Sequence, residues 1–361
     1  MHCVARVRLV VRPLALLLVV AISACATAIA PSPTPPGASA SAPPTQTPEP
    51  TPTPPVYWPL RGTLAPSADA IHKRPVLVRI PNDTAARPQS GLSKADMVWE
   101  LLAEGGITRY MAVFQSEEVD QIGPIRSARL SDLHYAPMLR GILAHVGAST
   151  VVLSRVRAAA AKGEFIDADQ FLYGDYYTRV TFRAAPQNVY TSTQRIRQAA
   201  KAAGDLGNVD VPALPIARNV EPVTERTGTS FSIPYLGAMA VRYSYDARAD
   251  GYTRVQAGVT TTDATTGKAV VAANVVVIFT DITPQPGIIE DSNGSLSLEI
   301  RSTGTGKVVI FRNGARLEGT WSRSGNDGYT FADQAGLPLS LVPGQTWVHV
   351  IPNDWTVTSA P

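Results

Sequence analysis

Cysteine is almost absent from this chain. Its 361 residues include only two, Cys3 and Cys25, and both belong to the N-terminal segment. The rest of the chain therefore has no thiol that could form a disulfide, act as a nucleophile or bind zinc. A folded body built from these later residues must be stabilised by packing and hydrogen bonds.

Charged residues are also scarce, at 17% of the chain against 45% hydrophobic residues. The 32 Lys and Arg exceed the 29 Asp and Glu by three, and Arg6, Arg8 and Arg12 precede Cys25, in a segment where no acidic residue occurs. The remaining chain is neutral and has no run of basic residues. This composition excludes a nucleic-acid partner, because phosphate backbones are bound by clustered positive charge.

Recognised catalytic patterns are missing as well. The chain has no G-x-S-x-G, P-loop or H-E-x-x-H sequence, and His72, His134 and His349 lack the spacing of a metal triad. We therefore predict no catalytic residue, no cofactor and no metal site. The sequence leaves open whether the protein is an enzyme.

The N-terminal segment from Met1 to Cys25 has the pattern of a signal peptide. The three arginines precede an apolar run at 13–22, which is too short to cross about 30 Å of hydrocarbon as a helix. The Ile-Ser-Ala-Cys sequence that ends at Cys25 resembles the lipobox of bacterial lipoproteins. It predicts lipidation of Cys25 and attachment to the extracytoplasmic face of the cell membrane. The alternative is an ordinary signal peptide cleaved near Ala28 or Ala30.

Residues 26–56 are predicted to form a disordered tether. Proline occupies almost half of the positions from 31 to 55, and no apolar residue larger than proline occurs there. Such a chain is extended at about 3.1 Å per residue, so it would act as a spacer. Aromatic residues begin at Tyr57, where we expect the folded part to start.

Residues 57–210 are predicted to form an α/β domain of sheet and helix layers. Strand patterns at 75–80, 97–114 and 141–147 alternate with helix patterns. The helix start signals are Ser127, Ser149 or Thr150, and Ser192, and Pro137 is expected to end the first of these helices.

Residues 211–361 are predicted to form a β-rich, mostly antiparallel domain. Alternation at 241–245, a buried apolar run at 274–280 and a final strand at 347–351 support this assignment. Asn313-Gly314 stands between two strand patterns and predicts a tight hairpin turn. No convincing helix pattern occurs in this half.

The segment at 97–114 also predicts which residues of its two strands lie opposite each other. If Gly105 and Gly106 form a two-residue turn, Glu100 opposes Met111 and shares one face of the hairpin with Arg109. Glu100 and Arg109 would then lie within reach of an ion pair.

The densest group of polar and glycine residues is predicted to form a ligand-binding pocket. Its predicted members are Arg109, Arg126, Ser127, Arg129 and His145, with Glu100 and Asn188 as supporting residues. A Gly-Pro loop that leads into a helix exposes backbone N–H groups, and the guanidinium groups suit carboxylate or phosphate. The alternative is that the arginines pair with acidic residues and hold loops together.

His145 lies at the end of a predicted strand, shortly before a Gly-Ala-Ser sequence. It could act as a base with Ser149 or a carboxylate, or it could be a buried histidine with satisfied hydrogen bonds.

Several ordered motifs resemble the YerB-like bacterial lipoprotein family, a family of unknown function. They are RPQSGLSKADMVWELLAEGGITRYMAVFQSE, IGPIRSAR and HVGAS in the first half, and SLEIRSTGTGKVVIFRNGARLEGTW and PGQTWVHVIP in the second. The resemblance covers about residues 70–353. It implies an α/β N-terminal domain with a β-rich C-terminal partner, and no established enzymatic activity. One departure is Gln187, where members usually have histidine, and glutamine cannot transfer a proton.

Three functions are consistent with these observations. The first is a membrane-anchored lipoprotein that binds an anionic envelope ligand or a partner protein. The second is a hydrolase that acts on envelope polymers through His145. The third is an envelope scaffold that docks another protein through an exposed strand edge.

Overall fold

The computed structural model describes residues 54–205, 207–220 and 225–360. The predicted signal peptide, the lipidation site Cys25 and most of the predicted tether lie outside the described residues. Across the described ranges, no helix is both long and apolar enough to cross a membrane.

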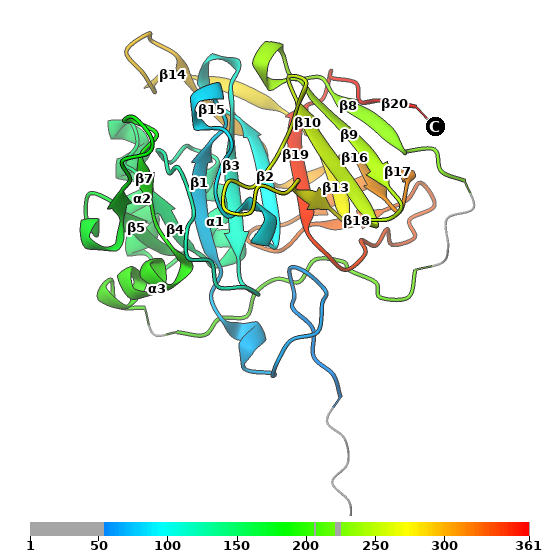
Figure 1. Cartoon of the computed structure of the whole chain (residues 1–361), viewed down its shortest axis with the longest axis horizontal. Coiled ribbons are helices and arrows are strands. Elements are labelled where there is room, and N and C mark those ends of the chain that lie inside the picture. The colour runs from blue at the N-terminus through cyan, green and yellow to red at the C-terminus, as the bar shows by residue number, and fades with distance from the viewer. Residues whose placement is uncertain (1–53, 206, 221–224, 361) are drawn as a thin grey trace, which may run out of the picture. The chain divides into compact units, whose positions relative to one another are not determined.

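A ten-stranded sheet forms the centre of the body (Figure 1). Its order is β18-β17-β16-β13-β19-β2-β3-β1-β4-β5. In chain order the strands are β1 (Val76–Pro81), β2 (Met97–Leu102), β3 (Thr108–Phe114), β4 (Ile142–His145), β5 (Ile166–Asp169), β13 (Asn274–Thr280), β16 (Gly304–Arg312), β17 (Ala315–Arg323), β18 (Thr330–Ala332) and β19 (Thr346–Pro352).

The sheet joins the two halves of the chain through β19. This late strand pairs in parallel with β2 from the first half and with β13 from the second. Trp347 lies opposite Val98 in the first pairing and opposite Val275 in the second. The predicted α/β and β-rich parts therefore share one continuous hydrogen-bonded sheet.

A second sheet of six strands packs against the first. Its main order is β11-β10-β9-β8-β20, with β12 paired to β10. The strands are β8 (Ser230–Ile233), β9 (Val241–Asp246), β10 (Gly251–Gln256), β11 (Val259–Thr260), β12 (Val271–Ala272) and β20 (Thr358–Ala360). Two small hairpins complete the strands, β6 (Thr178–Arg179) with β7 (Val189–Tyr190), and β14 (Ile282–Ile289) with β15 (Leu296–Ile300).

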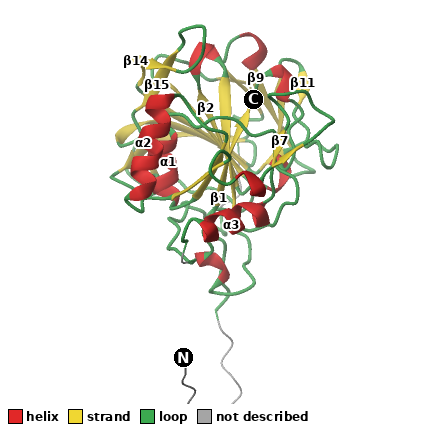
Figure 2. Cartoon of the chain, turned by 90° about the vertical axis from the view of Figure 1, so that its left-hand side faces the viewer, coloured by secondary structure: helices red, strands yellow, loops and turns green. Residues whose placement is uncertain are grey.

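Three α-helices cover the first half of the large sheet, α1 (Asp132–Leu139), α2 (Thr150–Ala161) and α3 (Thr193–Ala202). Figure 2 shows α1 and α2 side by side and α3 at the lower end of the body. Short 3₁₀ helices occur at Ala70–His72, Thr84–Ala86, Leu92–Lys94, Glu104–Gly106, Gly174–Tyr176 and Gly237–Met239.

Each face of the large sheet has its own core, because side chains alternate along a strand. On β1, Val76 and Val78 belong to the core that includes α3 and the six-stranded sheet. Leu77 between them belongs to the core that includes α1 and α2. Both faces are buried, which explains the nearly continuous apolar runs that predicted these strands.

The layered α/β part followed by a mostly β part is confirmed. Asn313 and Gly314 both adopt positive φ angles, of 51° and 78°, as a tight hairpin turn of the type predicted for this pair requires. Of the described residues that follow 210, only Gly237–Met239 are helical, as a single 3₁₀ turn.

The predicted start of the first helix was wrong. The helix begins at Asp132 rather than after Ser127, and Pro137 lies inside it. The Asp132 carboxylate accepts a hydrogen bond from the backbone N–H of Arg129, which stabilises the helix start at this position.

The predicted register of the β2–β3 hairpin was also wrong. Glu100 lies opposite Tyr110, and the last pair is Leu102 with Thr108. The connection is therefore five residues long, and it contains the 3₁₀ turn Glu104–Gly106. In this register Arg109 lies opposite Leu101 rather than Leu102. Because side chains alternate between the two faces along a strand, Glu100 and Arg109 point to opposite faces of the sheet.

The α3 start is confirmed at Ser192, whose hydroxyl accepts a hydrogen bond from the Arg195 backbone N–H at 3.1 Å. We expect Ser192→Ala to lower the free energy of unfolding by about 1 kcal/mol, because the N–H loses its partner. Urea unfolding followed by fluorescence measures this change. Ser324→Ala, in an exposed turn, is the control and should change stability by less than about 0.5 kcal/mol. Equal effects of the two substitutions would contradict the capping role.

Candidate functional site

The predicted site residues come from segments that meet at the carboxyl ends of parallel strands. Strands β13, β19, β2, β1, β4 and β5 run in the same direction, while β3 runs against its neighbours. The end of β4 and the start of β3 therefore lie at the same edge of the sheet. In open α/β sheets, ligands are bound outside this edge.

The structure brings Arg109, Arg126 and Arg129 together at this edge, around Glu104. Arg109 Nη2 donates to Glu104 Oε1 at 2.9 Å, and Arg129 Nε donates to Glu104 Oε2 at 2.6 Å. Burial by itself would raise the pKa of Glu104, but the hydrogen bond from Arg129 and the charges of both arginines lower it to about 2. Arg109 and Arg129 therefore pair with an acidic residue, which is the alternative to a ligand-binding pocket that the sequence left open.

Three further charged residues extend this arginine cluster. Arg79, which is 1% exposed, lies with its Nε 3.4 Å from Asp132 Oδ2. Glu290, from the second half of the chain, lies 3.4 Å from Arg129 Nε. The cluster therefore ties the two halves together. Within the described ranges, Arg126 forms no ion pair, and burial together with the charge of Arg129 lowers its pKa although Asp83 opposes this effect.

Ser127 and Asn188 also have structural partners. The Ser127 carbonyl accepts a hydrogen bond from Arg109 Nη1 at 3.1 Å. Asn188 Oδ1 accepts one from Arg179 Nη1 at 3.1 Å, on the β6–β7 hairpin.

Glu100 lies on the other face of the sheet, in a separate buried network. Arg254 Nη2 donates to its two carboxylate oxygens at 3.0 and 2.8 Å, and both side chains are at most 1% exposed. Asn82 and Thr108 donate to the same carboxylate. His349 Nδ1 lies 3.5 Å away, and burial followed by the charge of Arg254 lowers its pKa well below 6.5. The expected pair of Glu100 with Arg109 is replaced by a pair with an arginine from the other half of the chain.

His145 is completely buried. Its Nε2 lies 2.8 Å from Asp167 Oδ1, and its Nδ1 lies 2.9 Å from the Gly147 carbonyl oxygen. Burial by itself would lower the pKa of His145, but the hydrogen bond and charge of Asp167, helped by Asp169, raise it. With 0% of its surface exposed, this histidine cannot touch a substrate in this structure. The arrangement matches the buried, satisfied histidine considered in the sequence.

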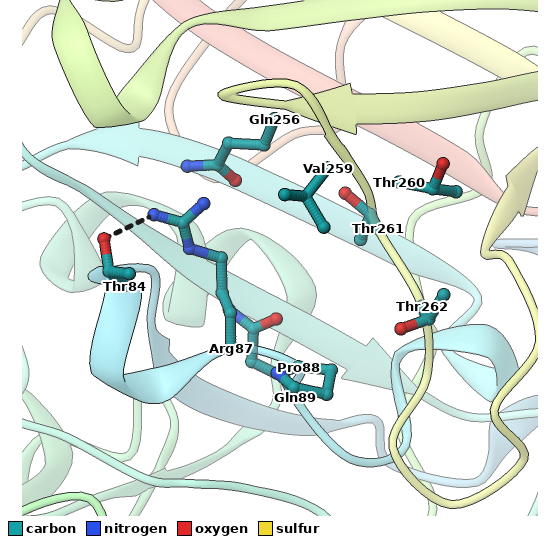
Figure 3. A pocket seen from close by; sticks show the side chains of 9 residues that line it. All are labelled: Thr84, Arg87, Pro88, Gln89, Gln256, Val259, Thr260, Thr261 and Thr262. Carbon is teal, nitrogen blue, oxygen red and sulfur yellow. Dashed lines mark hydrogen bonds between the residues drawn. The ribbon is translucent and has the colours of Figure 1, made fainter.

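A cavity of about 240 Å³ lies between the loop that follows β1 and the β10–β11 hairpin (Figure 3). Its lining consists of Thr84, Arg87, Pro88, Gln89, Gln256, Val259, Thr260, Thr261 and Thr262. Arg87 is the one charged member of this lining, and no carboxylate lines the cavity. We call it the junction cavity, because residues 84–89 and 256–262 belong to different halves of the chain.

The walls of the junction cavity are held by hydrogen bonds across the two halves. Arg87 Nη2 donates to Thr84 Oγ1 at 3.0 Å, as Figure 3 shows, and to the Ala238 carbonyl at 3.3 Å. Asp263, just beyond the second wall, accepts hydrogen bonds from the backbone N–H groups of Gly91 and Ser93 at 3.1 and 2.9 Å. These hydrogen bonds hold the two walls of the junction cavity in place and leave its interior open.

The floor of the junction cavity is connected to the Glu100 network. Gln256 Oε1 and Thr261 Oγ1 each accept a hydrogen bond from Arg254 Nη1 at 2.8 Å. Gln89 Nε2 donates to the Pro81 carbonyl at 3.0 Å. Sequence reasoning missed this cavity because its two segments are far apart along the chain and meet only through the fold. The one local signal was the threonine-rich run that begins at Thr260.

Two chain halves that share one sheet, with a cavity at their junction, define the structural class of this protein. The chain matches two family models, described as the N-terminal domain (residues 60–205) and the C-terminal domain (residues 231–348) of a protein of unknown function, DUF3048. The chain belongs to this family, and the expected resemblance is confirmed.

Two comparisons name the same relative. The chain is 34% identical over 297 residues to a Bacillus subtilis (strain 168) protein named "Putative lipoprotein YerB", covering 82% of this chain and 86% of the relative. The crystal structure of YerB protein from Bacillus subtilis superposes with a TM-score of 0.71 at 30% identity, covering 84% of this chain and all of that one.

Proposed function

We propose that this protein is a lipoprotein anchored at Cys25 to the outer face of the cell membrane, and that its junction cavity binds an anionic or hydroxyl-bearing group of the cell envelope. The lipobox-like sequence and the word lipoprotein in the relative's name support the anchor. The observation that carries the binding function is the lining of the junction cavity, which combines one arginine, two glutamines and four threonines with no carboxylate.

The chemistry of this lining favours an oxygen-rich ligand. A guanidinium group pairs with carboxylate or phosphate, while threonine hydroxyls can both donate to and accept from sugar hydroxyls. The cavity of about 240 Å³ is smaller than the roughly 300–1,000 Å³ typical of sites for drug-sized molecules. It therefore suits a single sugar unit or the acidic end of a peptide stem rather than a longer polymer segment.

Binding is tested with the full-length lipidated protein in phosphatidylcholine nanodiscs. The probe is a soluble peptidoglycan fragment with free stem-peptide carboxylates, titrated by calorimetry. We expect Arg87→Gln to weaken binding at least tenfold, because it removes the only charge in the lining. Thr262→Val should weaken binding of a hydroxyl-bearing fragment without a change of charge.

Arg248→Gln is the matched control, since Arg248 is exposed in the β9–β10 turn and its substitution makes the same change in charge. It should leave affinity unchanged. Absence of saturable binding by the wild-type protein, or equal weakening by Arg87→Gln and Arg248→Gln, would contradict the proposal. Melting temperatures of all variants show whether a loss of binding reflects a loss of folding.

A further inference from the structure

A second cavity lies at the opposite end of the large sheet. Lys73 and Arg74 closely precede β1, and Ile142 is the first residue of β4, so this cavity is at the amino ends of these parallel strands. The last turn of α3 closes it, at the lower end of the body in Figure 2. Its volume is about 200 Å³, and its lining consists of Lys73, Arg74, Ile142, Arg197, Lys201, Asp205, Gly207 and Asn208. We call it the basal cavity.

The basal cavity has an excess of positive charge. Four cations line it, and Asp205 is the single carboxylate in the lining, with its Oδ1 3.1 Å from Arg74 Nε. Glu118 lies beside the lining, where it contacts Lys73 Nζ and lies 3.5 Å from Arg197 Nε. The two acids leave two positive charges uncompensated, and Lys201 forms no ion pair with any described residue.

Arg197 supplies an unused hydrogen-bond donor. Its side chain is 17% exposed, and its Nη1 donates to the Arg74 carbonyl at 2.6 Å, which holds the guanidinium in place. Its Nη2 is buried and has no hydrogen-bond partner among the described residues, while its Nε faces the Glu118 carboxylate at 3.5 Å. Burial lowers the pKa of Arg197, while the charge of Glu118 opposes this effect. A buried donor without a partner is costly, so an anion that accepts from it would be bound favourably.

We propose that the basal cavity is a binding site for a phosphate group. Phosphate carries up to two negative charges and several acceptor oxygens, which match the two uncompensated charges and the free Nη2 donor of Arg197. The volume accommodates a phosphate with a small attached alcohol such as glycerol. Because the basal cavity and the junction cavity lie at opposite ends of the sheet, this site is independent of the proposed function.

The test uses the full-length protein in nanodiscs of phosphatidylcholine alone, titrated with inorganic phosphate at constant ionic strength. We expect saturable binding that Lys201→Gln weakens at least fivefold, since the exposed ammonium is lost without breaking an ion pair. Arg197→Lys retains the charge but removes the fork of donors, and it should also weaken binding. Lys268→Gln, in the exposed loop between β11 and β12, makes the same charge change elsewhere and should have no effect.

Two competition experiments identify the source of the phosphate. If a lipid headgroup occupies the site, adding phosphatidylglycerol to the nanodisc will compete with inorganic phosphate in the wild-type protein. If a soluble ester occupies it, sn-glycerol 3-phosphate will compete and phosphatidylglycerol will not. Either result supports the site. Absence of phosphate binding in phosphatidylcholine nanodiscs, or equal binding by wild type and Lys201→Gln, would overturn it.

Discussion

Replacing Glu100 with glutamine is expected to lower the free energy of unfolding by about 3–5 kcal/mol. The substitution leaves the Arg254 guanidinium buried between two sheets without its counter-charge, and removal of one partner of a buried ion pair has a cost of this size. Urea unfolding followed by tryptophan fluorescence measures the change, because the Trp347 ring centre lies 5.0 Å from the Arg254 guanidinium.

A second variant separates the ion pair from packing. The double substitution Glu100→Gln with Arg254→Gln removes both charges but keeps polar side chains within the network, and its cost should be smaller than the sum of the costs of the two single substitutions. The exposed pair of Asp281 with Arg301, at 2.8 Å, is the control, and Asp281→Asn should cost less than about 1 kcal/mol. A double variant whose cost equals or exceeds the sum of the two single costs would contradict the account of Glu100 and Arg254 as a mutually dependent pair.

Replacing Glu104 with glutamine is expected to cost about 3 kcal/mol at pH 7. The pKa of Glu104 is about 2 in the folded protein and near 4.5 without its partners, and each pKa unit corresponds to about 1.4 kcal/mol. Because the folded pKa is the lower one, the stabilisation is present above pH 4.5 and is lost as the pH falls toward 2. The difference between wild type and Glu104→Gln should therefore shrink over this acidic range.

Unfolding curves at several pH values between 2 and 7 measure this dependence. Glu225→Gln, at an exposed position, is the matched control and should show a difference near zero at every pH. A cost of Glu104→Gln that stays constant from pH 7 to pH 2 would show that the charge of Glu104 contributes nothing, and that only its shape matters.

The arginine cluster shows how far the sequence could predict the site. A glycine-rich turn and a Gly-Pro loop placed Arg109, Arg126 and Arg129 near one another, and the structure brings them together. The alternative considered from the sequence was that these arginines pair with acidic residues, and the structure shows Glu104 as the acid between Arg109 and Arg129. The participation of Arg79 and Glu290 carries no local signal, since both reach the cluster only through the arrangement of the sheet.

The hairpin register shows the opposite case. Whether Glu100 and Arg109 share a face depends on whether the connection has an even or an odd number of residues, and two adjacent glycines allow both. Because the connection has five residues, the Glu100 side chain lies on the face opposite to that of Arg109, and its ion-pair partner must come from its own face. Arg254, in the other half of the chain, is that partner.

The sequence by itself determined the features that depend on neighbouring residues. These include the helix start at Ser192, the turn at Asn313-Gly314 and the apolar runs of the strands, because capping, turn geometry and alternation act over a few positions. The tertiary structure decided which distant residues meet. The insertion of β19 beside β2 joined the two halves in one sheet. The junction cavity formed where residues 84–89 meet residues 256–262. Such contacts depend on strand order in space, which local patterns do not specify.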